Sequence, residues 1–272
     1  MHKAVEPPPA QRQSLLDQIA APAPRYLMRI ALLDKLIDRL PASLGRFLEI
    51  GPGMGDVSNY LLRRFDGVRG NIVDISEESI DIVRRRLEGC DRATLSVADF
   101  INLRDLKKYD LVVACEVFEH IDDDAAAFAA VNRLLATGGH FLFSVPAFMK
   151  KWGPADQYGG HVRRYEKEAL VRQFQEHGFD LVHFWSYGFP VTNIIGPVSS
   201  LYYRRAQMKS PLQQKNATKR SGTERSVATT LRRIPFGSLM RPFFFCQFLM
   251  KERNVGDGYV VLARKARDSR LG

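Results

Sequence analysis

The sequence predicts an α/β fold, in which a mostly parallel sheet carries helices on both faces. Apolar segments typical of buried strands alternate with helix-patterned segments from Arg46 to Val145, and this order builds such a sheet. A glycine-rich run at 51–55 joins the first strand to the next helix, which lets a ligand approach the main chain closely. Several strands end in a polar or acidic residue, so we expect one crevice at the carboxyl edge of the sheet.

Each element follows from a local pattern. Apolar residues recur at helical spacing from Tyr26 to Leu40, and Pro41 ends that helix. The first strand is 47–50, and the helix after the glycine run spans Asp56 to Phe65. The other elements are expected in the order strand 70–76, helix 77–88, strand 93–98, strand 109–116, a helix opened by 116–121, strand 140–145, helix 166–177, strand 179–185 and strand 258–264.

The glycines at 51, 53 and 55 fall at every second position, which is not the G-x-G-x-x-G spacing of dinucleotide-binding folds. This spacing argues against NAD or FAD. Glu49, near the end of the first strand, suits a cationic ligand better than a phosphate. An ordinary tight strand-to-helix connection is the alternative interpretation of this turn when it is taken alone.

The pattern Glu49-x-Gly51-x-Gly53-x-Gly55 resembles motif I of the class I S-adenosylmethionine (SAM)-dependent methyltransferases, of the type 11/12-like group. The resemblance covers about residues 25–185 and 257–265, and its specificity lies in the ordered set of motifs. It implies a Rossmann-like seven-stranded sheet whose last strand is antiparallel, with an insertion between strands six and seven. It also implies SAM as the cofactor.

Asp74 ends the second strand at the place where Rossmann-like folds hold a ribose, although it could instead cap the helix that follows. The resemblance implies that Asp99 lies near the adenine amino group and that Phe100 packs against the purine. The full set that we expect to hold SAM is Glu49, Gly51, Gly53, Gly55, Asp74, Ile75, Asp99, Phe100 and Glu116.

The chemical groups for methyl transfer are expected near the fourth and fifth strand ends, because SAM is already reactive and the protein mainly aligns the acceptor and removes a proton. Glu116, Glu119 and His120 would share one face of a helix. His161 lies in a glycine-containing loop and is the candidate general base, with Glu116 and His120 as the other catalytic candidates. The candidate substrate-binding residues, some of which could form structural ion pairs with Glu168 or another acid instead, are Trp152, Tyr158, Arg163, Arg164 and Tyr165.

A divalent metal is a second chemical possibility. The Glu-x-x-Glu-His string with a later His is similar to the metal site of the small-RNA 2′-O-methyltransferases, and Glu-Val-x-Glu-His also occurs in the ubiquinone-pathway O-methyltransferases. That resemblance implies a site formed by Glu116, Glu119, His120 and His161. The same string also occurs in methyltransferases that bind no metal, so metal-free catalysis by His161, or by proximity alone, stays open.

Positive charge is concentrated between Arg204 and Arg253, where twelve Lys and Arg stand against two acids and match the formal charge of +10 of the whole chain. We therefore expect three parts: a flexible N-terminus at 1–24, a SAM-binding domain at 25–185 plus 257–265, and a basic and apolar insertion at 186–256. The insertion, with a mobile middle at 209–230, would serve as a substrate lid or contact an anionic membrane surface. A nucleic-acid footprint is a third interpretation.

The chain of 272 residues can bury one large core, and its three cysteines lack metal-like spacing, as expected in a reducing compartment. No signal peptide is recognised, so we expect a cytoplasmic protein that could work at the inner face of a membrane. The predicted function is SAM-dependent O-methylation of a hydrophobic, lipid-linked or secondary-metabolite molecule. The alternatives are a non-catalytic SAM-fold protein that binds a membrane or partner, and an RNA methyltransferase. The acceptor atom and the oligomeric state are left open.

Overall fold

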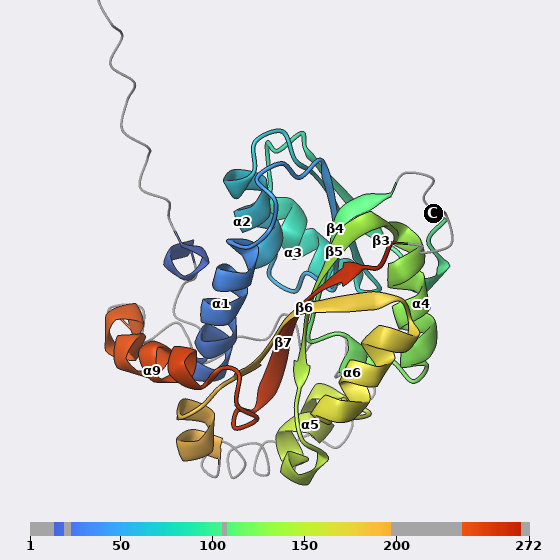
Figure 1. Ribbon diagram of the computed structural model, residues 1–272. Coiled ribbons are helices and arrows are strands. Elements are labelled where there is room, and N and C mark those ends of the chain that lie inside the picture. Colours follow the sequence, from blue (N-terminus) through green and yellow to red (C-terminus); the bar gives the residue numbers. More distant parts are fainter. Residues whose placement is uncertain (1–13, 19–22, 105–107, 197–235, 268–272) are drawn as a thin grey trace, which may run out of the picture.

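A seven-stranded sheet forms the centre of the molecule (Figure 1), with strand order β3-β2-β1-β4-β5-β7-β6. The computed structural model describes residues 14–18, 23–104, 108–196 and 236–267. Strands β1 to β5 pair in parallel, whereas β7 runs antiparallel to both of its neighbours. The predicted Rossmann-like sheet with an antiparallel last strand is thereby confirmed. The strands are β1 Arg46–Ile50, β2 Arg69–Asp74, β3 Ala93–Val97, β4 Tyr109–Cys115, β5 Leu135–Pro146, β6 Phe179–Tyr187 and β7 Gly258–Lys265.

Helices cover both faces of the sheet (Figure 1). One face carries α1 Pro24–Ile37, α2 Asp56–Arg64 and α3 Glu77–Arg86, and the other carries α4 Asp124–Leu134 and α6 Lys167–Glu176. Two further helices, α5 and α9, lie at Pro154–Gly159 and Phe236–Met250. Short 3-10 turns occupy Leu15–Gln18, Phe100–Asn102, Phe118–His120 and Met149–Lys151.

Successive side chains of each strand point to opposite faces of the sheet, and this produces two apolar cores, one on each face of the sheet. On β1, Phe47 packs among the residues of α1 to α3, whereas its neighbour Leu48 packs among those of α4 and α6. Successive side chains of a strand point to opposite faces, so a strand with helices on both faces must be apolar throughout. This is why the strands could be found as short apolar runs.

The prediction that 116–121 opens an α-helix is wrong. The chain there forms a 3-10 turn at Phe118–His120, and α4 begins only at Asp124. Asp123 explains that start, because its side chain accepts a hydrogen bond from the amide of Ala126 and caps the helix. Glu116 adopts a left-handed φ of 58°, so Glu116, Glu119 and His120 do not share one face of a helix.

The insertion contributes helix α9, which the sequence pattern did not predict because Pro242 stands inside it. α9 packs beside the outer side of α1 (Figure 1). The predicted mobile middle of the insertion, 209–230, and most of the predicted flexible N-terminus lie outside the part of the chain that the structure describes. Within the described ranges, no helix has the length and apolar character needed to cross a membrane.

Candidate functional site

A cavity of about 1220 Å³ opens above the carboxyl ends of β1, β2 and β4. α1 bounds it on one side, and the loop after β5 bounds it on another. Of the expected cofactor residues, the cavity is lined by Glu49, Gly51, Gly53, Asp74, Ile75, Asp99, Phe100 and Glu116. Gly55 lies just outside the lining, where it caps the start of α2.

The glycine loop forms the floor of the cavity. Gly51 and Gly53 have φ values of 64° and 54°, a region that other residues rarely adopt. A Cβ on Gly51 would stand 2.6 Å from Cγ2 of Val117. Gly51 and Gly53 therefore leave main-chain atoms uncovered in a loop whose other lining residues are Pro52 and Met54.

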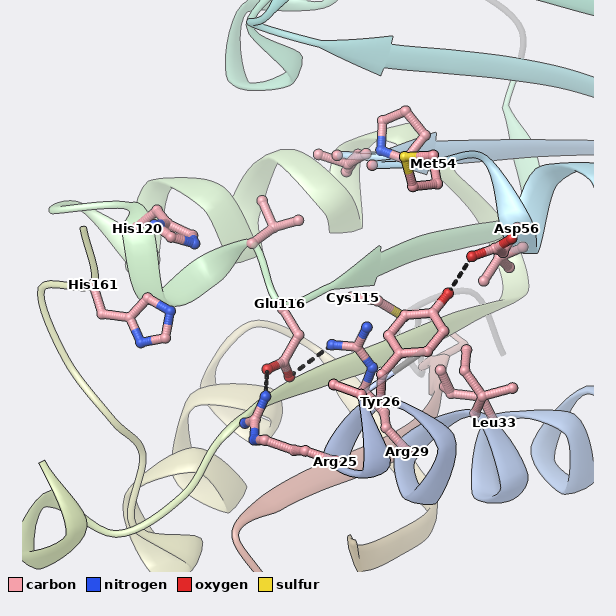
Figure 2. A pocket seen from close by; sticks show the side chains of 18 of the residues that line it. Arg25, Tyr26, Arg29, Leu33, Met54, Asp56, Cys115, Glu116, His120 and His161 are labelled. Atoms are coloured by element: carbon pink, nitrogen blue, oxygen red, sulfur yellow. Dashed lines mark hydrogen bonds and ion pairs between the residues drawn. The ribbon is translucent and has the colours of Figure 1, made fainter. Parts of the chain in front are cut away.

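Two acids lie beneath the glycine loop. Glu49 is buried and accepts a hydrogen bond from the Ser58 hydroxyl, and burial, followed by the nearby charge of Asp56, raises the pKa of Glu49 to about 8. Asp56 is itself buried and pairs with Arg86 at 2.7 Å, while the Tyr26 hydroxyl donates to it (Figure 2). This arrangement ties α1, α2 and α3 together below the loop.

Asp74, Ile75 and Asp99, which the sequence assigns to the nucleoside, all line the cavity. Ser76 caps α3, and its own amide donates to Oδ1 of Asp74 at 2.8 Å, so Asp74 is not the helix cap. Asp99 caps the turn that follows β3 by accepting from the amide of Ile101 at 3.0 Å. Ile75 lines the cavity with more than half of its surface exposed. An exposed apolar side chain could contact a purine, and a carboxylate can accept hydrogen bonds from the hydroxyls of a ribose.

Glu116 points toward α1 and away from His120 and His161 (Figure 2). Its carboxylate pairs with Arg25 at 2.8 Å and with Arg29 at 3.4 Å. Sequence reasoning missed both arginines. The available signal was their i, i+4 spacing at the start of an otherwise apolar helix.

His120 and His161 line another side of the cavity, and Glu119 lies buried beside them, outside the lining. The rings of His120 and His161 lie 4.8 Å apart, and one ligand atom from each of Glu119, His120 and His161 lies within 4.8 Å of the others. Nδ1 of His120 lies 3.2 Å from the Gly160 carbonyl oxygen, and Nδ1 of His161 lies 2.9 Å from Asp156. Because Nδ1 of each histidine contacts these oxygens, Nε2 is the nitrogen that can contact the other groups of the cluster.

Glu119 is the unusual member of this cluster. It is fully buried, and neither of its carboxyl oxygens has a hydrogen-bond partner in the structure. Its Oε1 lies 3.9 Å from Nε2 of His161. Burial raises the pKa of Glu119 to about 7, and burial together with the charge of His161 lowers the pKa of His120 to about 4.

An alternating chain of charges links His161 to the arginine of α1. Asp156 accepts from His161 and, at 2.8 Å, from Nε of Arg164. Arg164 reaches Asp257 at 3.3 Å, and Asp257 accepts from Nε of Arg25 at 2.7 Å. Burial alone would raise the pKa of Asp156, but the hydrogen bonds from His161 and Arg164 outweigh it and lower that pKa to about 2. Asp156 is therefore ionised throughout the working pH range.

Among the expected substrate residues, only Arg164 lines the cavity, and Trp152, Tyr158, Arg163 and Tyr165 lie outside the lining. Arg163 forms the structural ion pair that was the alternative, although its partner is Asp124 at 2.8 Å and not Glu168. Tyr165 is buried, and its hydroxyl donates to Asp124 at 2.9 Å. The rest of this side combines charged residues, Arg25, Arg29, Lys151 and Asp257, with apolar or neutral residues, namely Ile121, Ala155, Thr192, Asn193, Ile195 and Gly196.

Comparison with known proteins gives one family match. Residues 25–184 match the model of a family described as a methyltransferase domain. The chain is 33% identical over 97 residues to malonyl-(acyl-carrier protein) O-methyltransferase 1 of Ilyobacter polytropus, and the alignment covers 36% of each protein. It is 29% identical over 149 residues to the ubiquinone biosynthesis O-methyltransferase of Xylella fastidiosa, covering 49% of this chain and 59% of that protein.

These curated relatives are matched over about a third to three fifths of their own length. Among solved structures, the fold is similar to phosphoethanolamine N-methyltransferase 2 of Haemonchus contortus in complex with SAM. That similarity has a TM-score of 0.55 at 17% identity and covers 87% of this chain and 52% of the other. At this identity the similarity concerns the fold.

Proposed function

Because this chain belongs to the methyltransferase-domain family and is a class I SAM-dependent methyltransferase, we propose that it methylates an oxygen of a hydrophobic, lipid-linked or similar small molecule. The observation that carries this proposal is the division of the cavity. Strand ends with glycines and acids form one half, and His161 stands in the other, whose lining combines charged residues with the apolar residues Ile121 and Ile195. We also propose that the protein is located in the cytoplasm and acts at the inner face of a membrane.

The size of the cavity supports a two-ligand site. Pockets for single small ligands usually measure about 300 to 1000 Å³, and this cavity of about 1220 Å³ exceeds that range. Both a cofactor and an acceptor would therefore fit at once. Ile121 and Ile195 line the acceptor half, where an alkyl or prenyl group would be shielded from water.

The proposed roles follow from these positions. Asp74 and Asp99 would hold the ribose and the adenine of SAM, and the glycine loop would contact its methionine part through the backbone. SAM supplies a sulfonium-bound methyl group. His161 would accept the proton of the acceptor hydroxyl while that oxygen forms its bond to the methyl carbon and the bond from this carbon to sulfur breaks, so that the methyl ether and S-adenosylhomocysteine leave as products.

The test is turnover with a matched pair of acceptors. The protein is incubated with SAM and either a catechol carrying a long alkyl chain or the same catechol without it, and S-adenosylhomocysteine is measured. We expect turnover to favour the long-chain acceptor and His161→Ala to lower it about 100-fold or more. The control Glu88→Gln, at an exposed residue outside the cavity lining, should keep full activity. Equal turnover by His161→Ala, or no preference for the alkyl chain, would contradict the proposal.

A metal-assisted version of the same reaction is the second candidate, and the orphaned oxygens of buried Glu119 favour it. One carboxylate and two imidazoles suit a transition-metal dication, and each histidine has its Nδ1 held by another group, as metal-ligating histidines usually do. Such an ion would lower the pKa of an acceptor hydroxyl and anchor it. Glu116, the fourth expected ligand, lies with the arginines of α1 instead.

Calorimetry separates the two versions without any acceptor. Titration of the protein with Mn²⁺ or Zn²⁺ should show one site that Glu119→Gln removes, while the control Glu88→Gln, at an exposed residue of the same type, should retain it. No saturable heat in the unmodified protein would leave His161 as the metal-free base.

A further inference from the structure

Helix α9 has two faces of different surroundings. Met240, Phe243, Phe244 and Gln247 follow one another at i, i+3, i+4 and i+7 and lie on the inner side. The first three belong to or pack against a cluster with Leu27 and Met28 of α1. Gln247 is buried and bonds to the Met28 carbonyl and the Gly188 amide. The inner face is therefore fully used by the fold.

The outer face is apolar as well. Phe245 and Leu249 expose 67% and 66% of their surface, and Phe248 exposes 40%. With exposed Arg241 they stand at i, i+4, i+7 and i+8, which is one stripe of a helix. We call these four residues the outer stripe. A surface helix normally presents polar residues to water, so three large apolar side chains on one stripe indicate a contact surface.

The charges around the outer stripe are positive. Arg241 stands within the stripe, and Lys251 follows the helix with its Nζ 4.1 Å from the ring centroid of Phe248. Exposed Arg253 lies just beyond, and Glu252, which lies 3.7 Å from Lys251, is the nearest acid along the chain. In the described residues 236–253, three basic residues stand against one acid. A second copy of this chain would bring the same positive charge to the stripe, whereas an anionic surface would complement it.

We propose that the outer stripe inserts into the interfacial region of an anionic lipid bilayer. Apolar side chains flanked by Lys and Arg are the composition of helices that lie in the plane of a membrane interface, and each basic residue near an anionic surface contributes about 1 kcal/mol. Phe245, Phe248 and Leu249 enter the acyl boundary, while Arg241 and Lys251 remain among the headgroups.

The acceptor side of the cavity and helix α9 share the contact residue Ile195. Residues 191–196 form a helical segment after β6. In it, Ile195 packs beside α9 and lines the cavity, and the neighbouring Ile194 exposes 66% of its surface. Ile195 contacts the inner-side cluster of α9, so this helix stands between the acceptor side of the cavity and the outer stripe. Insertion of the outer stripe would therefore hold the acceptor side close to the bilayer, where a lipid-like acceptor is concentrated.

The test is flotation of the full chain with vesicles. Vesicles of phosphatidylcholine with phosphatidylglycerol are compared with pure phosphatidylcholine, at low and at high salt. We expect binding to the anionic vesicles only, weakened by salt, and a loss of about tenfold or more in Phe245→Ser/Leu249→Ser. Val97→Ser, an exposed apolar residue on the far edge of the sheet, is the matched control and should bind like the unmodified protein.

A spectroscopic measurement places the contact. The chain has two tryptophans, and Trp185 lies 6.4 Å from Phe248 between ring centroids. In Trp152→Phe, brominated anionic lipids should quench the fluorescence of Trp185, and the double serine variant in the same background should lose that quenching. Correct folding of each variant is confirmed by an unchanged unfolding temperature.

Several results would overturn the proposal. The serine variant could float as well as the unmodified protein, or neutral vesicles could bind equally well. Light scattering could reveal a dimer that only the serine substitutions dissociate, or those substitutions could weaken binding to a generic RNA and not to vesicles. The proposed lipid-like acceptor explains why membrane binding would be useful, but membrane binding itself does not depend on that acceptor. Flotation is measured without SAM or acceptor, so failed methylation and failed docking are distinguishable.

Discussion

Asp156 controls how His161 faces the cavity. Because Asp156 is ionised and accepts from Nδ1 of His161, the neutral imidazole carries its proton on Nδ1 and offers the lone pair of Nε2. Nε2 is the nitrogen 3.9 Å from Glu119. Asp156 is therefore a positioning residue for the proposed base.

Replacing Asp156 with Asn should remove the carboxylate that fixes the tautomer and the ring orientation of His161. We expect Asp156→Asn to lower turnover about 100-fold, and we expect the ¹⁵N spectrum of its labelled histidines to show a mixture of His161 tautomers where the unmodified protein shows one. His161→Gln assigns the signal, and Asp180→Asn, at an exposed residue, is the control. A single Nδ1-protonated form in Asp156→Asn would refute the positioning role.

Glu119 makes stability depend on pH. Its pKa is about 7 in the folded protein against 4.5 for the ordinary group, so the folded state holds this proton more tightly than the unfolded state. Its contribution to stability is fully present below about pH 4.5 and is lost as the pH rises through about 7. Gln imitates the protonated acid and cannot lose the proton.

We therefore expect Glu119→Gln to be close to the unmodified protein in unfolding free energy at pH 5 and more stable by up to about 3 kcal/mol at pH 9. Urea unfolding in the presence of a chelator at pH 5, 7 and 9 measures the difference. Glu88→Gln should show no such trend. A difference that stays constant across this range would mean that Glu119 is not a buried acid with a raised pKa.

Single residues differ in how far the sequence could reveal them. Glu49, Asp74 and Asp99 follow strands directly, so their place at the edge of the sheet came from local pattern. Arg25 and Asp257 could not be paired, because 232 positions separate them and only the position of β7 beside β5 brings them within 2.7 Å. No local rule links two such charges.

At the scale of elements, Gln247 joins three parts of the chain. Its side chain accepts from the amide of Gly188 at 2.7 Å and donates to the carbonyl of Met28 at 2.9 Å. Both bonds are buried. α9 is thereby fixed to α1 and to the end of β6.

Gln247→Leu keeps the size of this side chain but leaves a buried amide and a buried carbonyl without partners, which costs roughly 1 to 3 kcal/mol for each group. We expect the unfolding temperature to fall by roughly 5 to 15 °C, measured by calorimetry. Leu249→Ala, at an exposed position of the same helix, should change it by only about 2 °C or less. An equally small change in Gln247→Leu would show that these bonds do not hold α9.

Elements with a regular apolar period were predictable, and irregular ones were not. β1, β2 and β4 are buried on both faces and read as short apolar runs, and α6 has a clear helical period. The sequence predicts a helix that opens at 116–121, because Glu116 and Glu119 resemble the acids of a first helical turn. The Asp123 cap instead places the start of α4 at Asp124. The sequence did not predict α9, because Pro242 lies inside it and a proline normally ends a helix.

At the scale of the whole molecule, cofactor binding should stabilise the fold. A ligand present at one hundred times its dissociation constant adds about 2.7 kcal/mol, which corresponds to roughly 5 to 10 °C in a protein of this size. Differential scanning fluorimetry with SAM or S-adenosylhomocysteine measures this shift. Asp74→Ala should remove most of it, since charged hydrogen bonds contribute about 1.5 to 3 kcal/mol each.

Asp66→Ala, at an exposed acid, should keep the full shift. If neither ligand raises the unfolding temperature of the unmodified protein at any concentration, the assignment of the glycine loop and Asp74 to SAM is wrong.

The topology of the whole molecule was predictable because the order of motifs along the chain resembles a known family. The acceptor side was not, since it combines α1, the loop after β5, residues 191–196 and the residue before β7. Each of these pieces has an ordinary composition, and only the tertiary fold brings them around one space.

The two halves of the cavity differ in how they are anchored, and this has a consequence for evolution and engineering. Ends of buried strands form the nucleoside half, so substitutions there disturb the sheet. Segments such as 150–165 and 191–196 form the acceptor half and carry little of the central core. Variant libraries confined to the positions of these two segments other than Asp156, His161, Arg164 and Tyr165 would therefore explore new acceptors while sparing the cofactor, the proposed base and the scaffold.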